Sequence, residues 1–209
     1  EFDTRFAAAS PRAHPEIGGT TPPDGTRWYT LSGFDSDPTG KDAKALVPLI
    51  AGMKADAAGL AAAPRIVLDL RGNNGGSSDW SRQIATILWG AAAIRALPSD
   101  GEAVDWRVSP PKGRVYVLTD LGCASACLDA VDLWTALGAV QIGQETGADS
   151  LYMDIRRVTL PSGFAQAIVP MKVYRGRKRG TNVSAVPVHR YTGDMRDTPA
   201  LQRWVASLP

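Results

Sequence analysis

The stretch at residues 114–132 constrains the fold more than any other part of the sequence. An apolar, β-branched run at 115–118 is followed by a polar turn at 119–122, and small residues then begin a helical pattern of Ala, Leu and Val. The pattern predicts a strand, a tight turn and a helix in direct succession. Ser125 lies at the mouth of that helix.

A serine in this position lies at the carboxyl edge of a sheet, beside the unpaired N–H groups and the positive dipole end of the first helical turn. Backbone donors there can stabilise an oxyanion, so Ser125 is a candidate nucleophile. Helix caps and small packing residues are commoner at such positions than nucleophiles are. The local pattern alone is consistent with both roles.

An earlier part of the chain shows the same order of elements. Apolar residues recur at helical spacing over 41–60, between a strand expected at 27–34 and a second strand expected at 65–70, whose residues 66–68 form an unbroken apolar run. Strand, helix and strand in this order imply a right-handed crossover and a largely parallel sheet. The predicted fold class is therefore α/β.

A glycine-rich turn, RGNNGGSSDW at 71–80, follows the apolar run and leads into a further amphipathic helix. Gly72, Gly75 and Gly76 leave backbone N–H groups free to point at a ligand. Because neither GxGxxG nor Gly-Lys-Ser/Thr occurs here, the turn does not predict a nucleotide site.

The remaining pattern predicts one core domain over 26–209 behind an irregular, Pro- and Gly-rich leader at 1–25. The other expected elements are a short strand at 104–108, a strand at 139–143, a loop at 143–150, a β-hairpin of 151–160 with 164–174, and a final helix at 199–207.

Composition excludes several classes of partner. Lys and Arg number 23 against 21 Asp and Glu, so a net charge of +2 predicts no strong attraction to nucleic acid. The basic cluster at 175–180 is more typical of a solvated loop. No apolar run is long enough to span a bilayer, and no signal peptide is visible. The chain begins at Glu1 without a methionine, which suggests a processed or excised protein.

The two cysteines, Cys123 and Cys127, flank Ser125 at a spacing of four. Nothing in the sequence fixes the directions of their Cβ atoms, and we expect two buried thiols; a disulfide would instead indicate an extracytoplasmic protein. The two histidines, His14 and His189, are not spaced to join this pair, so a metal site is not expected. We expect no cofactor either.

Four motifs in order resemble those of peptidase family S41, the tail-specific or C-terminal processing proteases and their relatives. They are VLDLRGNNGG at 67–76, GCASAC at 122–127, IGQETG at 142–147, and LPSG followed by AIVP within 160–170. The resemblance runs from about residue 27 to about residue 204. It implies a ClpP/crotonase-like core with a mostly parallel sheet, crossover helices and a C-terminal β-hairpin.

By position, the resemblance implies that Ser125 attacks a peptide carbonyl to form an acyl-enzyme. The N–H groups of Ala126 and of Gly75 or Gly76 would form the oxyanion hole. The implied substrates are peptides or unfolded protein segments, seated by strand addition at a free strand edge beside Ser125. The implied location is periplasmic or secreted.

The strand-end pair of Asp69 and Arg71 is interpreted differently, as a structural carboxylate and guanidinium that hold the loops.

The chain departs from the family pattern at the general base. Where the Ser-Lys members carry a lysine, this sequence has Asp149, and an aspartate of ordinary pKa is a poor base for a serine. The alternatives are a histidine from upstream sequence, as in tricorn-like relatives, or His189, or less plausibly His14. The site could otherwise be inactive and the domain a peptide-binding or scaffold module.

Two other enzyme classes fit less well. An acyl-CoA enzyme of the crotonase shape would not need a serine nucleophile. An α/β-hydrolase is disfavoured, because the GxSxG motif does not occur at Ser125.

Overall fold

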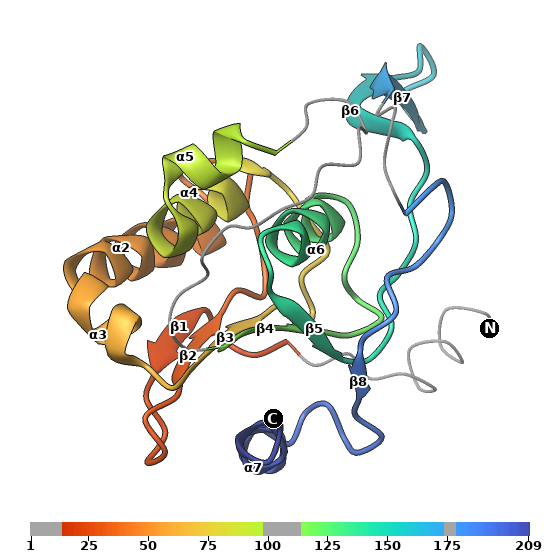
Figure 1. Ribbon diagram of the computed structural model, residues 1–209. Helices are drawn as coiled ribbons and strands as arrows, with labels where there is room; N and C mark the ends of the chain where they lie inside the picture. The colour runs from red at the N-terminus through yellow and green to blue at the C-terminus, as the bar shows by residue number, and fades with distance from the viewer. Residues whose placement is uncertain (1–13, 98–113, 174–178) are drawn as a thin grey trace.

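The computed structural model describes residues 14–97, 114–173 and 179–209. Its centre is a six-stranded sheet in which every neighbouring pair is parallel except the first (Figure 1). The strands, in spatial order, are β1 (Gly18–Thr20), β2 (Arg27–Thr30), β3 (Arg65–Asp69), β4 (Arg114–Thr119), β5 (Val140–Gly143) and β8 (His189–Arg190). The predicted α/β class with a mostly parallel sheet is confirmed.

Helices cover both faces of this sheet (Figure 1). One face carries α2 (Lys41–Ala55), α3 (Ala57–Ala62), α4 (Asp79–Trp89), α5 (Ala91–Arg95) and α6 (Ala126–Ala136), and the other carries α7 (Thr198–Ala206). Strands buried on both sides need no polar face, and this explains the continuous apolar runs of β3 and β4.

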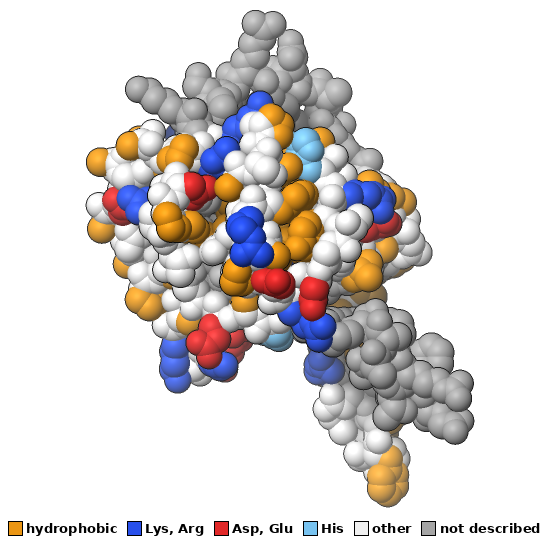
Figure 2. All heavy atoms as spheres, turned by 90° about the horizontal axis from the view of Figure 1, so that it is seen from below, with side chains coloured by type: hydrophobic (Ala, Val, Ile, Leu, Met, Phe, Trp, Pro, Cys, Tyr) orange, Lys and Arg blue, Asp and Glu red, His pale blue; other side chains and the backbone are white. Residues whose placement is uncertain are grey.

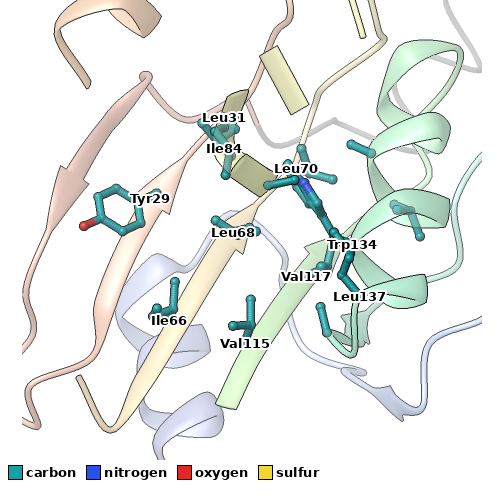
Figure 3. Packing of buried hydrophobic residues seen from close by; sticks show 14 of the residues in the cluster. Tyr29, Leu31, Ile66, Leu68, Leu70, Ile84, Val115, Val117, Trp134 and Leu137 are labelled. Carbon is teal, nitrogen blue, oxygen red and sulfur yellow. The ribbon is translucent and has the colours of Figure 1, made fainter. Parts of the chain in front are cut away.

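The alternation of side chains along the central strands divides the core into two clusters. Ile66 and Leu68 of β3 point toward the larger helical layer, where Trp134 of α6 packs (Figure 3). Val67, between them, points the other way and packs with Leu201 of α7. Each strand therefore anchors both helical layers.

Two expected elements differ in extent. The helix predicted over 41–60 is broken at Asp56 into α2 and α3, where the Asp56 carboxylate pairs with Arg27 at 3.2 Å and its carbonyl accepts from Leu60 N–H. The strand predicted over 27–34 ends at Thr30, because the following residues turn toward the glycine-rich loop, where Phe34 N–H donates to the Gly75 carbonyl.

The leader contains a strand that no alternation predicted. β1 lies within residues 1–25 and pairs antiparallel with β2. Residues 1–13 and the predicted strand at 104–108 lie outside the described residues, as does most of the basic cluster at 175–180.

The predicted hairpin is present as a separate two-stranded sheet of β6 (Tyr152–Thr159) and β7 (Gln166–Val173). Figure 1 shows it away from the helical layers, and most of its side chains are exposed.

Figure 2 shows acidic and basic side chains interspersed over the face seen there. No helix in the described part of the chain is long and apolar enough to cross a membrane.

Candidate active site

Three chain reversals meet at the carboxyl edge of the sheet. They follow β3, β4 and β5, which are adjacent strands running in the same direction. The first is the glycine-rich turn, the second carries Ser125, and the third is the loop that begins with the IGQETG motif. Parallel pairing thus brings together motifs that are far apart in the sequence.

Ser125 lies between the β4 turn and α6 in an unusual backbone conformation, with φ 56° and ψ −126°. For a residue with a Cβ this conformation costs on the order of 1–3 kcal/mol. The side chain makes no capping hydrogen bond to α6, so the structure does not support the capping role. Within the described part of the chain the hydroxyl has no hydrogen-bond partner, and it faces a cleft of about 810 Å³.

Gly75 passes directly in front of Ser125. A Cβ on Gly75 would lie 2.7 Å from the Ser125 Cβ and 2.9 Å from the Ala126 nitrogen. The φ of Gly75 is +103°, which favours glycine as well. A Cβ on Gly76 would overlap the Phe34 carbonyl oxygen, so both glycines are required by close contacts.

The three predicted oxyanion donors are not equivalent. Gly75 N–H donates to the Asn73 side-chain oxygen at 2.8 Å, and the Asn73 amide nitrogen donates to the Leu31 carbonyl at 2.6 Å. Among the described residues, the N–H groups of Gly76 and Ala126 have no acceptor. These two are therefore the donors available to a ligand. Asn73, fully buried, sets the shape of the turn.

Asp120 joins the first two turns. Its carboxylate accepts from Gly72 N–H at 3.0 Å and from Gly122 N–H at 2.8 Å. Burial is the main cause that raises the pKa of the Asp120 carboxyl above its usual value, and the negative charge of Asp69 raises it further. The hydrogen bonds from the two N–H groups and the positive charge of Arg71 act in the opposite direction, but the net shift is upward. The position of the glycine turn relative to the Ser125 turn depends on this buried carboxyl.

The Asp69–Arg71 pair has the structural role predicted for it. Both side chains are buried, and Arg71 Nε donates to Asp69 at 2.8 Å. Trp28 Nε1 also donates to Asp69 at 3.0 Å, and Arg71 donates to Thr198 at 3.1 Å and to the Met195 carbonyl. The pair joins the end of β3 to the start of α7.

The third loop packs against the Ser125 turn from the opposite side. A Cβ on Gly147 would lie 3.0 Å from the Cys123 carbonyl oxygen. Thr146 is buried and fastens the loop to Ala185, accepting from its N–H at 2.8 Å and donating to its carbonyl at 3.1 Å through the backbone.

The two cysteines form a disulfide, so the expectation of free thiols is wrong. The tight turn between β4 and α6 brings the Cα atoms of Cys123 and Cys127 to 5.3 Å, a usual separation for a disulfide. This approach of the two Cα atoms depends on the conformation of the turn, which the sequence did not specify.

None of the three base candidates, Asp149, His189 and His14, is among the residues that line the Ser125 cleft. Asp149 is ion-paired with Arg179 at 3.5 Å, and Arg179 also pairs with Asp132 at 3.3 Å. His189 pairs with Ile142 across β8 and β5.

His14 lines a second cavity of about 210 Å³. Asp42 lines both this cavity and the Ser125 cleft. The two hollows are thus neighbours.

The wall of the cleft opposite the glycine turn comes from the hairpin. Met153, Asp154, Ile155 and Arg157 of β6 line it, together with Met171 of β7. Strand β6 pairs with β7 along one edge only. Met153, Ile155 and Arg157 alternate along β6 and so share one of its faces, while the positive φ of Asp154, 53°, interrupts the regular strand between them.

Sequence reasoning missed Asn73, Asp120 and the disulfide as parts of this site. Asn73 lies inside the recognised motif, and Asp120 directly follows a buried strand, which is a usual place for functional polar groups. The described residues contain no cluster of His, Cys, Asp and Glu able to hold a metal.

Comparisons with known proteins bear on the family and the fold. The family model for peptidase family S41 matches residues 30–187. Similar solved structures include a presumed peptidase from Parabacteroides merdae (TM-score 0.59, 17% identity) and a presumed S41 protease from Bacteroides fragilis (TM-score 0.59, 20% identity). A third is a lipoprotein from Streptococcus agalactiae (TM-score 0.55, 14% identity).

These matches cover 91%, 95% and 98% of this chain and 63%, 59% and 72% of the respective structures. The chain therefore spans about 60% of the length of the first two. No curated protein matches the sequence. The similar structures share the fold, and the family model covers most of the chain. This chain belongs to peptidase family S41.

Proposed function

We propose that this protein is a serine peptidase that cleaves peptides or unfolded protein segments through an acyl-enzyme on Ser125. The observation that carries the proposal is the Ser125 hydroxyl, which has no hydrogen-bond partner among the described residues and lies against the glycine turn. Two N–H groups without acceptors, those of Gly76 and Ala126, adjoin it in the same region.

In the proposed reaction, the Ser125 oxygen attacks the peptide carbonyl carbon while a base takes the hydroxyl proton. The carbonyl oxygen becomes an oxyanion and accepts from Gly76 N–H and Ala126 N–H. The amine then leaves with a proton, and water hydrolyses the acyl-enzyme. Losing one such donor typically costs about 3 kcal/mol in transition-state stabilisation.

The hairpin supports an extended peptide as the substrate. The free edge of β6 can pair with a peptide backbone, and the side chains of Met153, Ile155 and Met171 offer apolar contacts along the same wall. A peptide added to β6 would pass the Ser125 hydroxyl across the cleft.

The base in this reaction can be a histidine or a carboxylate, and the ion pair of Asp149 with Arg179 argues against Asp149. A histidine base predicts that the rate of Ser125 modification rises with pH around a midpoint near about 6.5. A carboxylate base predicts a midpoint near about 4, and the pH profile of labelling distinguishes the two.

A second candidate function is a non-catalytic peptide-binding module. It is favoured by the fact that neither Asp149 nor His189 nor His14 is among the described residues that line the Ser125 cleft.

A fluorophosphonate probe decides between the two functions. The peptidase predicts labelling that is lost in Ser125→Ala and kept in Ser36→Ala, which removes the other serine lining the cleft. A wild-type protein that binds peptides but takes no label would support the binding module.

The disulfide supports an extracytoplasmic location, since disulfides persist in oxidising compartments. We propose a periplasmic or secreted protein on this ground. Free thiols at Cys123 and Cys127 in protein isolated from its native cell, measured by alkylation before lysis, would contradict this location.

A further inference from the structure

The disulfide encloses the candidate nucleophile. Cys123 and Cys127 are two residues before and two residues after Ser125, and both are fully buried in the larger core cluster, Cys127 within the first turn of α6. Ser125 is partly exposed and lines the cleft. The covalent link and the hydroxyl therefore lie on opposite sides of one turn.

The backbone of Ser125 needs such a restraint. Its positive φ of 56° is sparsely populated by residues with a Cβ and persists only where the surroundings enforce it. On one side, the Ser125 carbonyl accepts from Leu128 N–H at 2.9 Å and Asp129 N–H at 3.2 Å, within α6. On the other side, Cys123 N–H donates to the Asp120 carbonyl at 3.1 Å. The disulfide joins these two sides across the rotated residue.

We propose that Cys123 and Cys127 are positioning residues, and that their disulfide holds Ser125 in the conformation that presents its hydroxyl to the Gly76 and Ala126 N–H groups. This inference rests on the proposed role of Ser125. It follows that the intact disulfide is needed for nucleophilic attack more than for substrate binding.

The short loop closed by the disulfide distinguishes this positioning role from a general stabilisation of the folded domain. A disulfide stabilises a domain mainly by restricting its unfolded chain, and the effect grows with the length of the closed loop. Here the sequence separation is only 4. The link therefore restricts the turn more strongly than it restricts the unfolded chain.

The test compares the oxidised wild type with Cys123→Ala/Cys127→Ala in their reaction with a fluorophosphonate probe. We expect the rate constant of covalent modification to fall roughly ten- to hundred-fold in the double variant. The probe's reversible binding constant should stay unchanged, and unfolding in urea should remain cooperative. A folded double variant that reacts at the wild-type rate would overturn the proposal.

Reversible reduction provides the rescue control. A phosphine reductant in dilute urea converts the disulfide to two thiols, and glutathione disulfide then takes two electrons and two protons from them to restore the link. The modification rate should fall and then recover. This reduced wild type also replaces the double variant if that variant does not fold.

Amide hydrogen exchange tests the positioning role of the disulfide separately from the proposed peptidase function of Ser125. Amides at 122–129 should exchange faster in the double variant or the reduced protein, while those of β4 keep their protection. If the oxidised wild type takes no label, the proposed peptidase fails and exchange alone decides the positioning role. If the amides at 122–129 exchange at equal rates with and without the disulfide, the positioning role is overturned.

Discussion

At the scale of single residues, the site depends on close contacts that only certain side chains permit. Gly75→Ala would place a methyl group 2.7 Å from the Ser125 Cβ and strain a φ of +103°. We expect fluorophosphonate labelling of Ser125 to fall at least about tenfold, as after loss of an oxyanion donor. Gly138→Ala is the matched control, because Gly138 also has a positive φ but has nothing within 4 Å. Equal losses in the two variants would attribute the effect to backbone strain alone.

The buried carboxyl of Asp120 gives a residue-scale prediction about pH. Burial raises its pKa, so the folded state binds this proton more tightly than the unfolded state. The protonated Asp120 carboxyl contributes fully to the free energy of unfolding below the pKa it has in the unfolded chain, near about 4. This contribution is lost as pH rises through the higher pKa that the carboxyl has in the folded protein. Urea unfolding should therefore show the wild type losing stability relative to Asp120→Asn as pH rises from about 4.

Asp37 is the control of opposite sign. Hydrogen bonds from Thr39 lower the pKa of this exposed carboxyl, so its contribution is present above the unfolded pKa and is lost as pH falls through the folded pKa. Asp37→Asn should thus change the pH dependence only in the acid range. A difference between wild type and Asp120→Asn that does not vary with pH would refute the inferred environment of Asp120.

At the scale of elements, the hairpin of β6 and β7 is the part of the site whose side chains can be substituted without disturbing the core, because most of them are exposed. Ile155 lines the cleft but is 52% exposed, so Ile155→Ser should raise the KM for peptide cleavage several-fold and leave the melting temperature nearly unchanged. Phe164→Ser is the control, since Phe164 is 96% exposed and does not line the cleft. An equal rise in KM for both variants, or none for Ile155→Ser, would argue against β6 as the substrate edge.

Elements differ in how far the sequence could predict them. β3, β4 and α6 follow from long apolar runs and helical periodicity, and the hairpin follows from alternation about a Pro-Ser-Gly turn. β1 and β8 are too short to show a period and form because a neighbouring strand offers its edge.

The predicted meeting of Gly75 with Ser125 is confirmed, since adjacent parallel strands end at one edge. The disulfide could not be predicted, because it depends on the dihedral angles of a turn rather than on residue types. The bonds made by Asp120 depend in the same way on where two separate turns lie.

At the scale of the whole molecule, one buried ion pair connects the site's scaffold to the C-terminal helix. Arg71→Leu would leave the Asp69 carboxylate buried without its guanidinium and remove the links to Thr198 and Met195. We expect a loss of about 3–5 kcal/mol in the free energy of unfolding, measured in urea. Arg196→Ala, which breaks an exposed pair with Asp194, should have little effect. Comparable losses from the two variants would contradict the scaffolding role of Arg71.

The central claim is that Ser125 is a nucleophile served by the N–H groups of Gly76 and Ala126. The most direct measurement is a crystal structure of the protein after reaction with a fluorophosphonate. The account predicts a phosphonyl group on the Ser125 oxygen, with its phosphoryl oxygen within hydrogen-bond distance of both nitrogens. An unmodified Ser125, or a phosphoryl oxygen turned away from the glycine turn, would contradict it.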